Sequence, residues 1–158
     1  MSVIYLASAS PRRQELIRYL GINPKIVVSN FDEASLAHIK DPIVYVEAAA
    51  TGKAAAVADQ YQGIVIGVDT DVVCPDGHIL GKPENTEAAI AMLKQLSGRT
   101  HSVHSAIVLV DSTVVPHRVC SEITTTRVTF ADIPEDQLKA YVATGSPFDK
   151  AGGYGMQD

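Results

Sequence analysis

The sequence predicts an α/β protein, and three features of its pattern lead to this class. Two short runs, Val3–Ala7 and Gly63–Val68, are apolar or aromatic throughout, as strands are when both faces of a parallel sheet are covered. Helical signals lie between these runs, over Pro11–Leu20 and from Asp41 to about Tyr61. A Val- and Thr-rich stretch, Ser102–Phe130, then predicts a long β-ribbon.

The first predicted helix has a well-marked start and stop. Ser10 at the N-cap and Pro11 at the first helical position signal the start, and Gly21 signals the stop. Arg12 and Arg13 fall in the first turn, where the macrodipole disfavours each cation by about 0.3–1 kcal/mol. Helix N-termini bind phosphates, and arginine adds a bidentate fork. The pair is therefore either an anion site or two solvated arginines on a surface helix.

Apolar spacing and small residues predict how the helices pack. Leu16, Ile17 and Leu20 are expected on the buried face of the first helix. The alanines of the second helix allow close packing, although Gly52 within it costs about 1 kcal/mol. A third helix is expected over Asn85–Ser97, with Gly98 as its stop.

Acidic residues directly follow the second apolar run, and we expect the strand formed by this run to end at Val68. Asp69, Thr70 and Asp71 come next. Ligands of open α/β sheets bind outside the carboxyl ends of strands, where carboxylates serve as metal ligands or as a general base. Two clustered acids favour a functional role for Asp69 over the cap of a turn. Asp71 either adds a metal ligand or faces solvent.

Two lysines are further candidates for contact with an anion. Lys53 lies among the small residues of the second helix, where its side chain either reaches a ligand or extends to water. A hairpin is expected over Val72–Leu80, and Lys82 follows it between Gly81 and Pro83. That setting suits a fixed phosphate contact and equally suits an ordinary exposed turn.

Length and composition favour one globular domain, residues 1–158, with 46% hydrophobic and 20% charged residues. No apolar run approaches the roughly 20 residues of a membrane span, and no signal-peptide pattern is present. A net charge of −5 argues against general binding to nucleic acid. Cys74, Cys120 and the histidines show no metal-ligand spacing, so a reducing cytoplasm is expected. The lack of G-x-G-x-x-G after the first run disfavours a Rossmann dinucleotide enzyme.

Seven short segments occur in a fixed order along the chain. They are SASPRRQEL (Ser8–Leu16), Asp32-Glu33, Lys53-Ala54, GVDT (Gly67–Thr70), Gly81-Lys82-Pro83, LSGRTH (Leu96–His101) and DKAGGYGMQ (Asp149–Gln157). Together they resemble the Maf proteins, nucleoside triphosphate pyrophosphatases with the inosine-triphosphatase-like (Maf/Ham1) fold. The resemblance implies an elongated mixed sheet with two lobes around a deep cleft. It also implies that Mg²⁺ or Mn²⁺ assists hydrolysis of the α–β bond of a nucleoside triphosphate, releasing the monophosphate and pyrophosphate.

The resemblance also implies roles for single residues. Asp69 is the expected general base. The implied substrate contacts are those of Ser8, Arg12, Arg13, Lys53, Thr70, Lys82 and Gln157. The implied metal ligands are Glu33, Asp69 and Asp71. Within the substrate contacts, Arg12, Thr70 and Gln157 are the specificity positions, and their combination resembles the dTTP/UTP branch rather than the branch that favours methylated GTP.

The end of the sequence differs from the family pattern. Family members usually continue past the position of Gln157 through another strand and a helix, whereas this sequence ends at Asp158. We therefore expect the last strand and helix to be lacking and Gln157 to be weakly held. The alternative function is a nucleotide-binding protein with little or no catalysis. A homodimer is expected, because a second copy would cover the surface left exposed.

Overall fold

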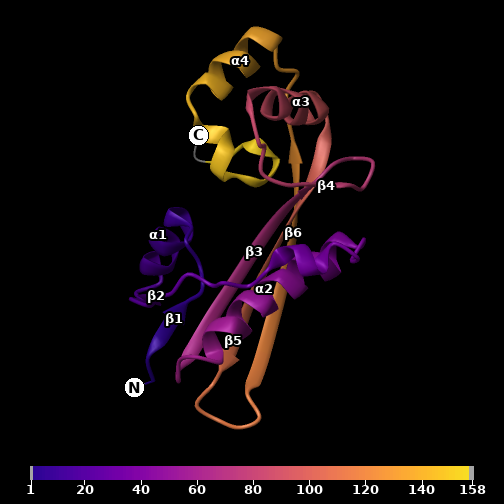
Figure 1. Cartoon of the computed structure of the whole chain (residues 1–158). Helices are drawn as coiled ribbons and strands as arrows, with labels where there is room; N and C mark the ends of the chain where they lie inside the picture. Colours follow the sequence, from indigo (N-terminus) through magenta and orange to yellow (C-terminus); the bar gives the residue numbers. More distant parts are fainter. Residues whose placement is uncertain (1, 157–158) are drawn as a thin grey trace. The chain divides into compact units, whose positions relative to one another are not determined.

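A computed structural model describes residues 2–156 as a mixed six-stranded sheet with helices (Figure 1). The strands are β1 (Ile4–Leu6), β2 (Lys25–Ile26), β3 (Ile64–Val73), β4 (Ile79–Leu80), β5 (Thr100–Asp111) and β6 (Arg118–Thr129). The α-helices are α1 (Pro11–Tyr19), α2 (Pro42–Ala58), α3 (Thr86–Leu96) and α4 (Glu135–Ala143). Short 3₁₀ turns cover Glu33–Leu36, Ser146–Asp149 and Ala151–Gly153. The predicted α/β class is confirmed.

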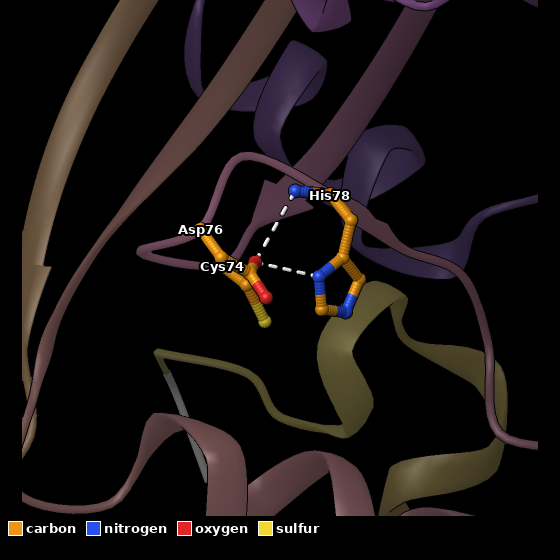
Figure 2. A group of neighbouring side chains, drawn as sticks. All are labelled: Cys74, Asp76 and His78. Atoms are coloured by element: carbon orange, nitrogen blue, oxygen red, sulfur yellow. Dashed lines mark hydrogen bonds and ion pairs between the residues drawn. The ribbon is translucent and has the colours of Figure 1, made fainter.

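The sheet combines parallel and antiparallel pairs. Its strand order is β2-β1-β3-β5-β6, and β4 pairs with β3 outside this path. β1 runs parallel to β2 and to β3, whereas β3 and β4 are antiparallel, with Val72 opposite Leu80. The predicted hairpin over residues 72–80 is therefore confirmed, and its turn is seen in Figure 2.

Contacts group the chain into two compact units. The first comprises the residues up to Asp69 together with Ser105–Thr124, and the second comprises Thr70–His104 together with the residues from Thr125 on. No helix in the described part of the chain is long and apolar enough to cross a membrane.

Helices cover both faces of β1 and β3 in the first unit. Successive strand residues point to opposite faces, so Val65 packs against α2 while Ile66 packs with Ile17 of α1. The core on the α2 side also contains side chains from β1 and from β5, namely Tyr5, Ala7, Ala106, Val108 and Val110. The expectation that the two apolar runs are strands buried on both faces is confirmed.

Two details of the predicted elements are wrong. Ile17 is buried as expected, but Leu16 is 53% exposed and Leu20 is 75% exposed. Only Ile17 of α1 joins the apolar cluster with Leu6 and Ile66, so the buried face of this short helix is one residue wide. The strand predicted from the second apolar run also does not end at Val68. Instead, β3 continues to Val73, and its last residues pair with β4.

The second unit packs α3 and α4 together and carries one end of a long ribbon. Ala89 and Leu93 of α3 share a core cluster with Leu138 and Val142 of α4. Two side-chain contacts show that β5 and β6 run antiparallel here, since later residues of β5 contact earlier residues of β6. These pairs are Thr100 with Thr129 and His104 with Thr125, each at 2.8 Å. The predicted third helix and the β-ribbon are both confirmed.

His101 is an ionisable side chain buried in an aromatic cluster of this unit. It is 2% exposed, its Nε2 lies 2.6 Å from the Tyr154 hydroxyl, and its ring meets those of Phe130 and Tyr154 edge-on. Its Nδ1 has no hydrogen-bond partner among residues 2–156. Burial lowers the pKa of His101 and raises the pKa of Tyr154 to about 12.

The lowered pKa of His101 predicts a loss of stability in mild acid. The unfolded chain binds the proton at the ordinary pKa of about 6.5, above the pKa in the folded protein, so stability is complete above that pH and falls below it. We expect the midpoint of urea unfolding to decrease from pH 7.5 to 5.5, and to decrease less in His101→Gln. His117→Asn is the control, because His117 is exposed. An equal pH dependence in His101→Gln and the unmodified chain would contradict this prediction.

Candidate active site

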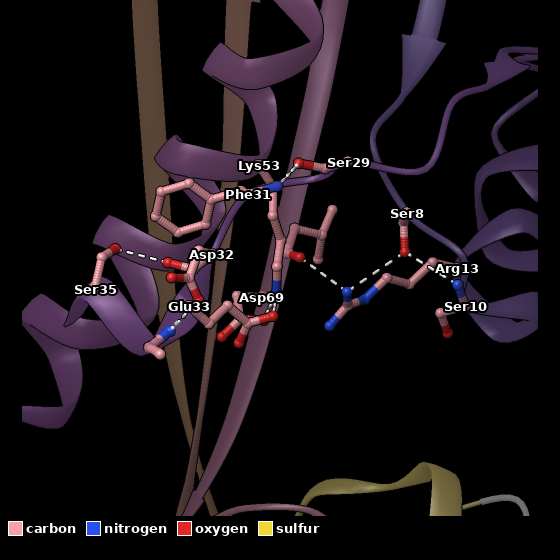
Figure 3. A network of polar contacts seen from close by, with 12 residues as sticks. Ser8, Ser10, Arg13, Ser29, Phe31, Asp32, Glu33, Ser35, Lys53 and Asp69 are labelled. Carbon is pink, nitrogen blue, oxygen red and sulfur yellow. Dashed lines mark hydrogen bonds and ion pairs between the residues drawn. The ribbon is translucent and has the colours of Figure 1, made fainter. Parts of the chain in front are cut away.

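Lys53, Asp69 and Glu33 form one ion-pair group in the first unit (Figure 3). The Lys53 ammonium Nζ lies 2.5 Å from Asp69 Oδ1 and 3.0 Å from Glu33 Oε1. Asp69 is buried, whereas the Glu33 side chain is about half exposed. A single ammonium therefore holds together one interior carboxylate and one surface carboxylate. The alternative that the Lys53 side chain simply extends to water is wrong, whereas its contact with a ligand stays a prediction.

Close packing of α2 on β3 brings Lys53 to Asp69. Asp69 points to the same face of β3 as Gly67, two residues earlier. A Cβ at Gly67 would lie 2.2 Å from the Ala50 carbonyl oxygen and 2.8 Å from Ala54 Cβ, so only glycine allows the helix this near. Since Lys53 precedes Ala54 on that helix, its side chain extends along β3 to the carboxylate.

Glu33 is positioned by a short turn fixed at two points. Asp32 Oδ1 accepts a hydrogen bond from the Ala34 N–H at 3.0 Å, which caps the turn and leaves Asp32 in a structural role. The ring of Phe31 occupies the space where a Cβ at Gly52 would lie, only 2.4 Å from the ring atoms. No direct sequence signal pointed to Phe31. The indirect signal was Gly52 itself, a glycine inside an otherwise favourable helix.

Arg13 is fixed beside the strand residue that precedes Asp69. Its Nη1 donates to the Val68 carbonyl oxygen at 2.8 Å and lies 3.5 Å from Ser8 Oγ. Ser8 Oγ also accepts from the Ser10 N–H at 3.2 Å, while the Ser10 side chain makes no capping bond. A guanidinium carries five N–H donors, so Arg13 can bind a phosphate while it keeps these contacts.

The other predicted site residues differ in their exposure and in the unit to which they belong. Arg12 is partly exposed in the first turn of α1. Thr70, Asp71 and Lys82 belong to the second unit, where Thr70 is partly exposed and Lys82 is exposed. Asp71 is 7% exposed, so the alternative that it faces solvent is wrong. Gln157 lies outside the described residues.

The donor set of this group fits a hard divalent cation. Mg²⁺ and Mn²⁺ prefer carboxylate oxygens, which Glu33 and Asp69 supply. Lys53 pairs with Oε1 of Glu33 and Oδ1 of Asp69, and each carboxylate has a second oxygen that can also act as a ligand. Mg²⁺ usually binds one or two carboxylates together with waters and substrate phosphates. The group supplies two carboxylates, and Arg13 contacts the residue before one of them.

The mixed α/β architecture is that of the Ham1 or inosine-triphosphatase-like fold. The crystal structure of the nucleoside-triphosphatase, dITP/XTP pyrophosphatase, from Mycobacterium abscessus matches this chain with a TM-score of 0.50. That match covers 83% of this chain and 75% of the other, at 18% sequence identity, and it therefore bears on the fold alone. The chain itself belongs to the family of Maf-like proteins, whose sequence model matches residues 3–158.

Similar proteins within the family are named dTTP/UTP pyrophosphatase. The dTTP/UTP pyrophosphatase of Moorella thermoacetica is 48% identical over 99% of this chain and 79% of its own length. The dTTP/UTP pyrophosphatase of Desulforamulus reducens is 46% identical over 99% of this chain and 81% of its own length. These relatives are by name hydrolases that act on acid anhydrides. The Maf resemblance drawn from seven segments is confirmed.

Proposed function

We propose that this chain hydrolyses dTTP and UTP to the nucleoside monophosphate and pyrophosphate. The observation that carries the proposal is the Lys53–Asp69–Glu33 group, with Arg13 held at the residue before Asp69. Its cations and carboxylates are the parts that phosphoryl chemistry needs, because that chemistry depends on positioning and on neutralising charge. The relatives named dTTP/UTP pyrophosphatase support the choice of substrate.

Asp69 is proposed as the general base. Its carboxylate takes a proton from a water molecule, whose oxygen forms a bond to the α-phosphorus. The bond from the α-phosphorus to the bridging oxygen breaks, and pyrophosphate leaves with that electron pair. Lys53 holds the carboxylate in position through the Oδ1 contact, so the base does not have to be ordered when the substrate arrives. The added oxygen therefore ends in the monophosphate.

Glu33 and Asp69 are the residues proposed to hold the metal, with Asp71 as a further candidate. When bound, a divalent cation neutralises charge on the triphosphate and orients it. Asp71 is proposed because it is a second buried carboxylate, two residues after Asp69 in the sequence. Arg13 and Ser8, at the start of α1, are proposed to bind phosphate oxygens, and Lys82 to add a further cation.

Base recognition is proposed for Arg12, Thr70 and Gln157. A site that hydrogen-bonds one base edge rejects a base that leaves buried polar groups unpaired, and such discrimination can reach about 10⁴-fold. We expect kcat/KM for dTTP and UTP to exceed that for ATP and GTP by at least about 10²-fold. The measurement is pyrophosphate release from a panel of nucleoside triphosphates with Mg²⁺ or Mn²⁺. Comparable values for UTP and ATP would contradict the proposed specificity.

Turnover in water labelled with ¹⁸O tests the bond that is cleaved. We expect the label in UMP and none in pyrophosphate. Label in pyrophosphate would place the attack on the β-phosphorus, and release of orthophosphate would contradict the reaction itself. Binding of UTP without turnover would support the alternative function, a nucleotide-binding protein.

A further inference from the structure

The turn between β3 and β4 gathers three metal-ligating side chains that the proposed active site does not use. Cys74, Asp76 and His78 each offer a ligand atom, and these atoms all lie within 4.8 Å of one another (Figure 2). We propose that this turn is a metal site that binds Zn²⁺. The sequence spacing did not indicate it, because the three residues alternate along a hairpin rather than following a cysteine-pair pattern.

Backbone hydrogen bonds hold the turn in the shape that brings these side chains together. The Cys74 N–H donates to the His78 carbonyl at 2.9 Å, and the Gly77 N–H donates to the Cys74 carbonyl at 2.9 Å. Gly77 has a φ of +92°, a conformation that glycine adopts readily. The antiparallel β3–β4 pair, which joins Val73 to Ile79, closes the turn at its base. Binding a metal therefore does not require a disordered loop to become ordered.

The side chains already interact with one another. Asp76 Oδ1 lies 2.6 Å from His78 Nδ1, and the His78 N–H donates to the same oxygen at 3.4 Å. The Cys74 thiol donates to Gln95 Oε1 at 3.4 Å. Cys74 is buried, whereas Asp76 and His78 are exposed. The anchored sulfur thus fixes one ligand position, and the two surface side chains can turn toward it.

The chemistry of the donor set favours Zn²⁺. Zn²⁺ accepts thiolate, imidazole and carboxylate together, at about 2.3 Å for sulfur and about 2.0–2.2 Å for nitrogen and oxygen. Tetrahedral geometry at those bond lengths puts the ligand atoms roughly 3.5 Å apart, so small side-chain rotations suffice. Mg²⁺ and Ca²⁺ prefer oxygen ligands and are poorly matched to a thiolate and an imidazole. Three protein ligands leave the fourth position to water.

The test measures metal binding directly and does not depend on catalysis. Excess Mg²⁺ is first added to occupy the carboxylate site, and Co²⁺ is then titrated as a spectroscopic substitute for Zn²⁺. We expect one Co²⁺ per chain with a thiolate-to-cobalt charge-transfer band, which addition of Zn²⁺ abolishes. A chromophoric chelator in competition gives the Zn²⁺ affinity.

Matched variants connect the signal to the turn. Cys74→Ala is expected to abolish the charge-transfer band, and His78→Asn and Asp76→Asn to weaken Zn²⁺ binding at least about 10-fold. His78 and Asp76 are exposed, so their variants test the site even if Cys74→Ala folds poorly. Cys120→Ser and His117→Asn, exposed residues outside the turn, are the controls and should bind as the unmodified chain does.

Two results would overturn the proposal. One is a charge-transfer band that persists in Cys74→Ala or disappears in Cys120→Ser, and the other is Zn²⁺ affinity unchanged by both His78→Asn and Asp76→Asn. Pyrophosphatase activity is expected to stay within about two-fold in His78→Asn and Asp76→Asn, because neither residue belongs to the Lys53–Asp69–Glu33 group. A result showing that the turn does not bind Zn²⁺ would therefore not contradict the proposed pyrophosphatase function.

Discussion

Asp69→Asn is expected to lower kcat for UTP by about 10²–10⁴-fold, the usual contribution of a positioned general base. The asparagine amide keeps the size of the carboxylate and an oxygen that can accept from Lys53, but it cannot take the proton from water. KM should change much less than kcat, because the phosphate contacts proposed for Arg13 remain. Steady-state release of pyrophosphate measures both parameters.

Asp59→Asn is the matched control for this prediction. Asp59 is an exposed carboxylate at the C-terminal end of α2, the helix that carries Lys53. Its variant should keep kcat within about two-fold and unfold at a temperature close to that of the unmodified chain. Asp69→Asn leaves the Lys53 ammonium with Glu33 as its remaining charged partner, so this variant should unfold at a lower temperature, and kcat is measured well below that temperature. A kcat within a few-fold of normal in Asp69→Asn would remove Asp69 from the mechanism.

Gly67→Ala is expected to destabilise the protein and to reduce its activity. The added Cβ would lie 2.2 Å from the Ala50 carbonyl oxygen, a backbone atom that can move only if α2 moves. Overpacking of this kind costs about 1–3 kcal/mol in the free energy of unfolding. Because the same helix carries Lys53, a shift of about 1 Å would also misplace the ammonium at Asp69, an error that can cost roughly 10²-fold in rate. Urea unfolding and UTP turnover are the two measurements.

Gly81→Ala is the corresponding control for stability. A Cβ at Gly81 meets no atom within 4 Å, and the residue does not adopt a positive φ. The free energy of unfolding should therefore change by less than about 0.5 kcal/mol. Equal destabilisation by the two substitutions would show that the close approach of α2 to β3 does not account for the effect at Gly67.

The sequence predicted the elements whose signals are local. Asp41 directly precedes Pro42, at the predicted start of the second helix, and caps α2 by accepting from the Ile43 and Val44 N–H groups. The wholly apolar runs became β1 and the first part of β3, because their composition leaves no solvent-facing side. Local chemistry thus determined where most helices and strands lie.

Features that depend on distant contacts could not be predicted in this way. The extension of β3 past Val68 depends on pairing with β4, and a strand can carry Asp69 in its middle only because Lys53 neutralises the buried carboxylate. The position of Glu33 depends on the ring of Phe31 over Gly52, two residues on separate segments. The deep cleft, the homodimer, the cytoplasmic location and the role of Gln157 stay predictions.

The order in which the chain is synthesised has a consequence for the first unit. Tyr5 and Ala7 share a core with Ala106, Val108 and Val110 of β5, which are synthesised much later. Because synthesis adds about 5–20 residues per second, β1 stays without these packing partners for several seconds or more. Contacts between residues so far apart in sequence slow folding, and exposed apolar strands invite aggregation meanwhile. The nascent chain should therefore depend on chaperones until β5 has been made.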